Sequence, residues 1–234
     1  MHKIKLISFD LDDTLWDGRK VIRQAQNSMF DWLKTHHPQV SNKTSPDIYF
    51  TYRQAVLLSH PDKKHDLTFL RKEVLKNIFI ANNYTPNAAH QHAESAFSAF
   101  YKARNSVQFF NDAEATLNQL KKQFILAALT NGNADPVMTG LHPYMDYFFS
   151  AESVGKAKPH PEMYLQLLKK SDMKAEQCIH IGDHPQLDII SASKVGMKTI
   201  WFNPDKKKWP EKIRPNREFN NFLQLPKIIE KLTN

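Results

Sequence analysis

Two aspartates near the start of the chain, Asp10 and Asp12, directly follow an apolar segment. Residues two apart on an extended segment point to the same side, so both carboxylates can face one site. One carboxylate can accept a phosphoryl group as an acyl phosphate, while the second protonates the leaving alcohol and then activates water. Clustered carboxylates also suit Mg²⁺, which prefers oxygen ligands. The alternative is a pair of solvated turn aspartates.

Further polar groups follow later apolar runs. Thr130-Asn131-Gly132 offers a hydroxyl and backbone amides that can hold phosphate oxygens, although Asn-Gly is also a common turn pair. Lys158 precedes a proline, which fixes the local backbone and can aim the lysine. Its ammonium group would offset charge on a transferring phosphoryl group. A solvated loop lysine is the alternative.

Two more acids, Asp183 and Asp188, follow a third apolar run. Asp183 can bind a metal ion. Asp188 can support such a site from behind, or it can be the acid that favours the N-terminus of the next helix.

Apolar runs separated by helical patterns predict the frame that holds these groups. Uninterrupted apolar strands are typical of a sheet covered on both faces, and their alternation with helices indicates a parallel α/β sheet. Ligands of such sheets lie beyond the carboxyl ends of the strands. The expected strands are residues 6–9, 124–129, 178–181 and 199–202, with a shorter one at 148–149. The expected helices are 112–122, which Asp112 can cap, one starting at Pro161, and 187–195.

A stretch without strand signals, residues 17–109, lies between the first two strands. It predicts several helices, with Ser45, Asp66 and Thr85 as N-caps. The stretch is too long for a simple crossover, so we expect a helical cap at 17–109 inserted into a core of residues 1–16 and 110–234. Candidate substrate contacts in the cap are Arg19, Arg23 and Arg104, although solvated helix faces explain them equally well. The aromatic residues Tyr49, Phe50, Tyr52 and Phe97 fit core packing better than ring stacking.

Composition limits the class of protein. The chain has 234 residues, a formal charge of +8 and one cysteine, Cys178. A basic surface can steer anionic metabolites, and no nucleic-acid-binding signature accompanies it. No apolar run is long enough to span a bilayer, and no signal-peptide segment precedes the first strand. We therefore expect a cytoplasmic protein with small-molecule ligands, without a nucleic-acid or membrane partner and with no evident protein partner.

The sequence resembles the haloacid dehalogenase-like (HAD) superfamily, in which four motifs recur in this order. Here they read Asp10-x-Asp12-x-Thr14, then Thr130 after an apolar strand, then Lys158-Pro159, then Gly182-Asp183 with Asp188. The resemblance covers the whole chain. It implies a three-layer Rossmann-like α/β core with an all-helical cap of the C1 type inserted after the first motif.

The resemblance also implies roles for individual residues. Asp10 would be the nucleophile, Asp12 the general acid and base, and Lys158 the group that neutralises charge. Mg²⁺ would be held by Asp10, the backbone carbonyl of Asp12, and Asp183. The phosphate would be held by Thr130, Asn131 and Gly132, with Thr14 and Asp188 supporting the site from behind. The implied activity is that of a phosphoric monoester hydrolase with an aspartyl-phosphate intermediate.

A narrower resemblance is to the bacterial phosphatases that act on flavin mononucleotide and on the phosphoribitylaminouracil intermediate of riboflavin synthesis. It is carried by residues 9–17, Arg19, His37-Pro38 and residues 128–134. His160 and His184 depart from the acidic or small polar residues expected there. Other readings stay open: a sugar or nucleotide phosphatase, a haloacid dehalogenase, or a non-catalytic ligand-binding relative. An acid at Asp12 favours phosphoryl transfer over dehalogenation.

Overall fold

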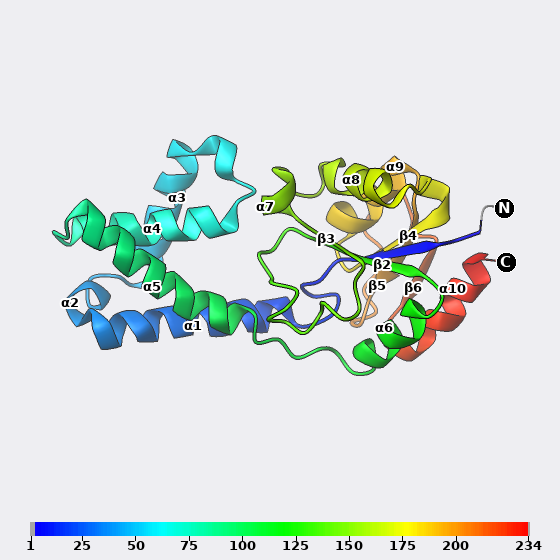
Figure 1. Ribbon diagram of the computed structural model, residues 1–234, viewed down its shortest axis with the longest axis horizontal. Helices are drawn as coiled ribbons and strands as arrows, with labels where there is room; N and C mark the ends of the chain where they lie inside the picture. The colour runs from blue at the N-terminus through cyan, green and yellow to red at the C-terminus, as the bar shows by residue number, and fades with distance from the viewer. Residues whose placement is uncertain (1–2, 234) are drawn as a thin grey trace. The chain divides into compact units, whose positions relative to one another are not determined.

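The computed structural model describes residues 3–233 and divides the chain into two compact units (Figure 1). An α/β unit consists of Met1–Gly18 and Gln108–Asn234, and a helical unit of Arg19–Val107. These junctions lie close to the predicted ones, which followed residues 16 and 109. Each unit has an apolar core of its own. The helical unit is inserted into the α/β unit between the first and second strands.

The α/β unit is built on a six-stranded parallel sheet with the order β3-β2-β1-β4-β5-β6. The expected α/β fold is therefore confirmed. Central strands read as continuous apolar runs because both faces of the sheet are covered. The strands are β1 Leu6–Phe9, β2 Ile125–Thr130, β3 Tyr147–Ser150, β4 Cys178–Gly182, β5 Lys198–Phe202 and β6 Arg217–Phe219.

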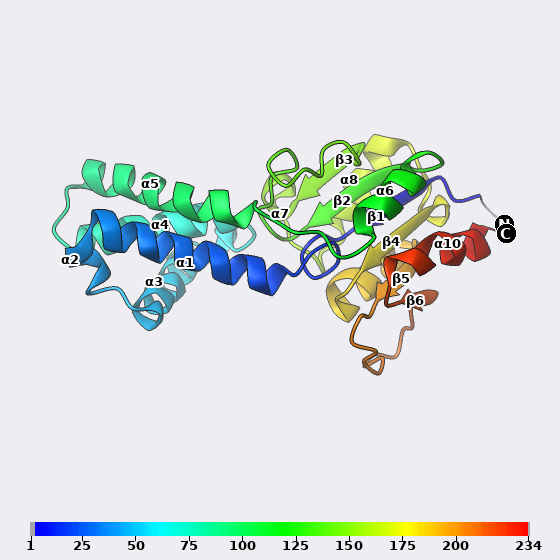
Figure 2. The same cartoon turned by 90° about the horizontal axis from the view of Figure 1, so that it is seen from below.

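Helices lie on both faces of this sheet, as Figures 1 and 2 show. The helices α6 Ala113–Lys121 and α10 Leu225–Thr233 pack together on one face. The opposite face carries α7 Ala151–Val154, α8 Glu162–Ser171 and α9 Ser191–Val195. A π-helical turn, Pro185–Ile190, leads directly into α9, and Gly196 ends it in the left-handed conformation. Short 3₁₀ turns at Ala175–Gln177 and Phe222–Gln224 complete the unit.

The helical unit consists of α-helices around an apolar core of its own. The predicted N-caps are confirmed, since Ser45, Asp66 and Thr85 each accept a hydrogen bond from a backbone amide three residues later. The helices are α1 Gly18–His36, α2 Pro38–Ser41, α3 Pro46–Ser59, α4 Leu67–Ala81 and α5 Pro86–Arg104, with a 3₁₀ turn at Pro61–Lys63. Tyr49 and Phe97 are buried in the core, as expected for packing residues, whereas Phe50 is 55% exposed.

Two local predictions were wrong, and one strand was missed. Asp112 adopts the left-handed conformation before α6, and its side chain forms no capping hydrogen bond. Pro161 precedes α8 as its N-cap rather than forming the first helical residue. The edge strand β6 was missed, because two of its three residues are exposed and it has no apolar run.

Candidate active site

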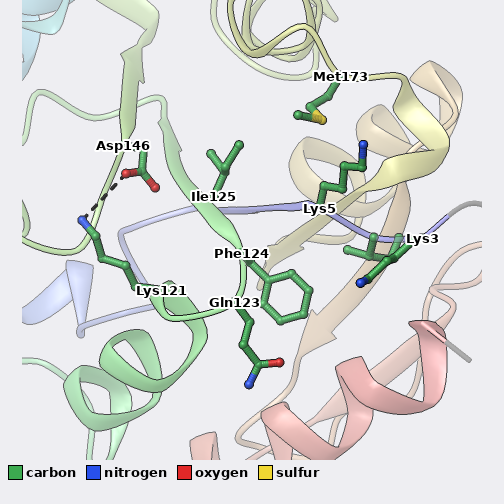
Figure 3. Close-up of a pocket in the computed structure, with 9 residues that line it drawn as sticks. Lys3, Lys5, Lys121, Gln123, Phe124, Ile125, Asp146 and Met173 are labelled. Carbon is green, nitrogen blue, oxygen red and sulfur yellow. Dashed lines mark ion pairs between the residues drawn. The ribbon is translucent and has the colours of Figure 1, made fainter.

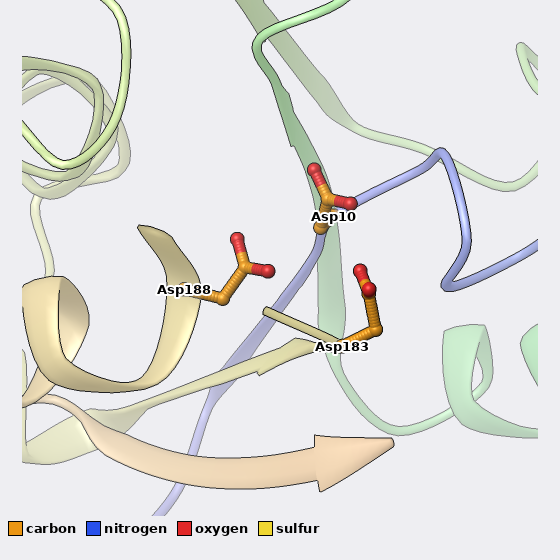
Figure 4. A group of neighbouring side chains, drawn as sticks. All are labelled: Asp10, Asp183 and Asp188. Atoms are coloured by element: carbon orange, nitrogen blue, oxygen red, sulfur yellow. The ribbon is translucent and has the colours of Figure 1, made fainter. Parts of the chain in front are cut away.

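The polar residues singled out from the sequence meet at the carboxyl edge of the sheet. Asp10 follows β1, Thr130 ends β2 and Asp183 follows β4. Oxygen atoms of Asp10, Asp183 and Asp188 all lie within 4.8 Å of one another, and Figure 4 shows the three side chains converging. Neighbouring parallel strands bring these residues together although most of the chain separates them.

Lys158 lies at the centre of this cluster. Its Nζ donates to Asp10 Oδ1 and to Asp188 Oδ1, both at 2.6 Å, and to the backbone carbonyl of Leu129 at 2.8 Å. The side chain is buried, so the prediction of an aimed lysine describes it better than that of a solvated one. The ammonium therefore has all three of its hydrogens engaged.

The side chain of Asn131 holds the backbone of Lys158. Its Oδ1 accepts from the Lys158 amide at 2.7 Å, and its Nδ2 donates to the Lys158 carbonyl at 2.9 Å. Sequence reasoning proposed a backbone amide contact to phosphate for Asn131 and did not foresee this positioning role. Next to it, the amide of Gly132 donates to Thr130 Oγ1 at 2.9 Å. Hydrogen bonds within the protein therefore fix the conformation of the Thr130–Gly132 turn.

Three carboxylates compete for one ammonium group, and this sets their ionisation. Burial works against the charge of Lys158, but Asp10 and Asp188 outweigh it and raise the lysine pKa. Burial also opposes ionisation of Asp188, yet Lys158 and His180 hold its pKa below the usual value. The pKa of Asp10 is raised by burial, against Lys158, with Asp188 and Asp183 adding to the rise. Burial, Asp188 and Asp13 raise the pKa of Asp183 to about 7.

This electrostatic imbalance fits a divalent cation. The donor set consists of hard carboxylate oxygens, which Mg²⁺ prefers. Burial and the neighbouring acids raise the pKa values of Asp10 and Asp183, and a cation among them would offset both effects. Thr14 supports the same two acids, since its hydroxyl lies 3.2 Å from Asp183 Oδ1 and 3.5 Å from Asp10 Oδ2.

Asp188 is fixed by groups that sequence reasoning did not identify. His180 Nε2 lies 3.4 Å from Asp188 Oδ1, and the His184 amide donates to Asp188 Oδ2 at 3.0 Å. Burial lowers the pKa of His180, which disfavours protonation of the ring. Gly182 is required here, because a Cβ at that position would lie 2.4 Å from the Asp188 carboxylate carbon. The sequence feature that could have indicated this contact is His180 itself, a histidine inside the apolar run of β4.

Asp12 is held by its own loop. The indole nitrogen of Trp16 donates to Asp12 Oδ1 at 2.8 Å. A Cβ at position 18 would lie 2.6 Å from Asp12 Cβ, so only glycine fits there without a shift of the neighbouring atoms. Asp13, in the left-handed conformation, accepts from the Gly18 amide and closes the loop. Trp16 is fully buried, and sequence reasoning missed its role because it looks like a core residue.

The two histidines with unknown roles are local caps. His184 Nδ1 accepts from the amides of Gln186 and Leu187, both at 3.2 Å, and so caps the π-helical turn. His160 Nδ1 accepts from the Glu162 amide at 3.3 Å at the start of α8. Both side chains are exposed. In the helical unit, Arg19 and Arg23 lie at or near the surface, whereas Arg104 is fully buried.

A surface hollow of about 490 Å³ lies at the opposite, amino-terminal edge of the sheet (Figure 3). It is lined by the residues before β1, the start of β2 and the turn before β3, and Lys121 and Asp146 form an ion pair of 3.8 Å at its rim. None of the carboxylates at the carboxyl edge contributes to it. The acidic cluster is therefore the better candidate for chemistry.

Comparison with known proteins agrees with this geometry. The family model of the haloacid dehalogenase-like hydrolases matches residues 4–196. The 5-amino-6-(5-phospho-D-ribitylamino)uracil phosphatase YigB of Escherichia coli is 29% identical over 98% of both chains. Glyceraldehyde 3-phosphate phosphatase of Pyrococcus furiosus is 26% identical and covers 99% of this chain, which spans 94% of that protein.

A solved structure is also similar over nearly the whole chain. The crystal structure of a protein named 2-haloacid dehalogenase, from Pseudomonas syringae, superimposes with a TM-score of 0.94 at 36% identity. It covers 97% of this chain and 99% of its own. No helix among residues 3–233 is long and apolar enough to cross a membrane.

Proposed function

Because the chain belongs to the haloacid dehalogenase-like hydrolase family, we propose that this phosphoric monoester hydrolase is a Mg²⁺-dependent phosphatase working through an aspartyl phosphate. The observation that carries the proposal is the contact of Lys158 Nζ with Asp10 Oδ1 at 2.6 Å, beside the carboxylate of Asp183. A nucleophilic carboxylate, a fixed positive charge and a group of metal-binding oxygens are the parts that phosphoryl transfer needs.

In the first step, a carboxylate oxygen of Asp10 attacks phosphorus and the bond to the leaving alcohol breaks. Asp12 gives its proton to that alcohol, which leaves neutral. Lys158 offsets the negative charge on the phosphoryl oxygens, and the hydroxyl of Thr130 orients one of them. In the second step Asp12 takes a proton from water, and the resulting hydroxide cleaves the acyl phosphate and restores Asp10.

Asp10, Asp183 and the backbone carbonyl of Asp12 would hold Mg²⁺, with Asp188 and Thr14 behind them. When bound, Mg²⁺ keeps the carboxylates ionised and offsets charge on the phosphoryl group. The raised pKa values of Asp10 and Asp183 support this proposal, because these acids resist ionisation until a further positive charge is present.

The proposed substrates are small phosphorylated metabolites. Flavin mononucleotide or the phosphoribitylaminouracil of riboflavin synthesis leads the list, since the E. coli relative that matches the whole chain is named for the second compound. The Pyrococcus relative is named for a triose phosphate, so sugar phosphates belong in the same test.

A phosphate-release screen tests the proposal. Flavin mononucleotide, the phosphoribitylaminouracil, sugar phosphates, nucleotides and pyridoxal phosphate are compared at equal concentration with Mg²⁺ and with a chelator. We expect release that stops on chelation and a preference of at least about tenfold, or 1.4 kcal/mol, for the flavin or ribitylamino compound. A flat profile would contradict the substrate proposal alone, and no release from any ester would contradict the phosphatase.

Dehalogenation is the second candidate, favoured by the name of the similar Pseudomonas structure. It needs a nucleophile but no acid for an alkoxide leaving group, and here Asp12 offers such an acid, held by Trp16. Halide release from 2-chloropropionate without a metal requirement would favour this candidate. We expect none above background.

A further inference from the structure

Trp201, a residue of strand β5, reaches the loop that carries Asp183. Its indole nitrogen donates a hydrogen bond of 2.7 Å to the backbone carbonyl of Asp183. In the register of the sheet, Trp201 pairs with Gly182 on the neighbouring strand β4, and Asp183 directly follows that strand. From the sequence, Trp201 was expected only to be part of an apolar strand. The structure adds a polar contact to one of the acids at the candidate site.

The position of the indole is set by packing within the α/β unit. Trp201 is 3% exposed, so its N–H group cannot turn to water. The ring of Trp209 packs against it edge-on, with the two ring centroids 4.9 Å apart. A buried indole N–H needs an acceptor, and the Asp183 carbonyl serves as one. The direction from which this carbonyl is held is therefore fixed by the core.

The acceptor belongs to a peptide unit that is held at both ends. The carbonyl of Asp183 and the amide of His184 lie in one planar group. The amide donates to Asp188 Oδ2 at 3.0 Å, while the carbonyl accepts from Trp201. A hydrogen bond to the carbonyl also polarises the amide as a donor. One indole therefore acts on the backbone of Asp183 and on a hydrogen bond of Asp188.

Fixing this peptide plane restricts the backbone that directs the Asp183 side chain. The carboxylate itself is held from another part of the chain, since the Thr14 hydroxyl lies 3.2 Å from Asp183 Oδ1. Asp183 is thus held at its carbonyl and at its carboxylate by separate residues. Mg²⁺ demands near-ideal octahedral geometry, so it binds best to oxygens that are already in position.

We propose that Trp201 is a positioning residue for Mg²⁺ binding and acts by fixing the Asp183–His184 peptide unit. The inference rests on the proposed metal-dependent function, in which Asp183 is a ligand. Trp201 is not itself a ligand, because its indole nitrogen is a donor only.

The proposal is tested by the affinity for Mg²⁺, measured without substrate. The melting temperature of the full-length protein is followed as Mg²⁺ is titrated, and its concentration dependence gives Kd. Trp201→Phe removes the donor and keeps an aromatic ring, and we expect its Kd to be about tenfold weaker than that of the wild type. The matched control is Trp209→Phe, which removes an indole donor to the Ile213 carbonyl in the loop before β6 and should keep the wild-type Kd.

The outcomes separate this proposal from the metal-dependent function. If the wild type shows no response to Mg²⁺, the metal site is contradicted and the role of Trp201 with it. If the wild type responds and Trp201→Phe has the same Kd, the positioning role alone is overturned. A lower melting temperature of Trp201→Phe without metal, with an unchanged Kd, would mean that the residue only stabilises the fold.

A second variant keeps the test valid if Trp201→Phe does not fold. Replacing Trp201 by benzothienylalanine keeps the size of the bicyclic ring and exchanges only the N–H group for sulfur. The same loss of Mg²⁺ affinity is expected, because the hydrogen bond to the Asp183 carbonyl is the feature that both variants remove. An unchanged Kd in this variant would likewise overturn the positioning role.

Discussion

The indole nitrogen of Trp16 donates a hydrogen bond of 2.8 Å to Asp12 Oδ1, four residues earlier in the same loop. The bond fixes the rotamer of the acid to which we assign proton transfer. In the second step this carboxylate must be placed to receive a proton from water. A residue that looks like core packing thus positions the acid.

Trp16→Phe removes this donor and keeps an aromatic ring. We expect kcat/KM to fall about tenfold, because a hydrogen bond to a charged group is worth about 1.5–3 kcal/mol. The loss should be larger for esters with poor leaving groups, which depend most on protonation. The control is Trp209→Phe, which removes an indole donor to the Ile213 carbonyl. Equal activity of Trp16→Phe and the control would contradict the positioning role.

Gly182→Ala places a methyl group against the Asp188 carboxylate, 2.4 Å from its carbon. Asp188 cannot yield, because Lys158 and the His184 amide hold it. We expect a loss of about 1–3 kcal/mol in the free energy of unfolding together with a large loss of kcat. Gly140→Ala is the comparison: it meets nothing within 4 Å but strains a positive φ, so it should lower stability by about 1–2 kcal/mol and leave kcat unchanged. Activity loss in both variants would argue against a local effect.

Asp183→Asn tests the metal site by a readout other than activity. The wild type should melt higher when Mg²⁺ is added, by about 5 °C at a hundredfold excess over Kd. The variant should lose this response. Without metal it should melt higher than the wild type above pH 7, because the variant lacks a carboxylate whose ionisation is opposed by burial and by the neighbouring acids. Asp172→Asn, an exposed change on the same unit, should keep the metal response. An undiminished response in Asp183→Asn would place the ion elsewhere.

We expect the free energy of unfolding of the helical unit to depend on pH through His37. Its Nδ1 lies 2.9 Å from the Tyr84 hydroxyl, which in turn accepts from Gln39 Nε2 at 2.7 Å. Tyr84 can therefore give its hydrogen to the ring, and a proton on Nδ1 would set donor against donor. Burial, with His92 and His36 nearby, lowers the pKa of His37.

A lowered histidine pKa means that the unfolded chain binds more protons, so stability rises with pH. The contribution of His37 is present above about pH 6.5 and is lost as the pH falls from there through the folded-state pKa. In urea unfolding, the difference between wild type and His37→Gln should therefore shrink between pH 7.5 and pH 5.5. The control His90→Gln changes an exposed histidine of α5 and should show no such trend. If the difference in the free energy of unfolding between wild type and His37→Gln did not change with pH, this explanation would be contradicted.

The elements that follow simple periodicity could be predicted, and those that depend on tertiary contacts could not. The buried strands and the caps at Ser45, Asp66 and Thr85 follow from local sequence. β6 could not be found, because an exposed edge strand has no apolar pattern. The capping role expected for Asp112 was wrong, since this residue adopts a left-handed backbone and its side chain forms no capping hydrogen bond.

At the site, Asp10, Thr130 and Asp183 could be selected because they end or follow strands, and Lys158 because it precedes a proline. The side chains that hold them could not. Asn131 bonds to the backbone of Lys158 twenty-seven positions later, and His180 reaches Asp188 from inside an apolar strand. Such contacts depend on which strands become neighbours, and no local spacing records that.

The most direct test of the central claim is Mg²⁺-dependent phosphate release by Asp10→Asn and by Asp13→Asn. Asp13 lies in the same loop, and asparagine retains both its left-handed backbone and the Oδ1 that accepts from Gly18. We predict that Asp10→Asn loses at least about a thousandfold in kcat and that acid-quenched enzyme no longer carries labelled phosphate, while Asp13→Asn stays within about threefold of wild type. Continued phosphate release by Asp10→Asn would contradict the aspartyl-phosphate mechanism.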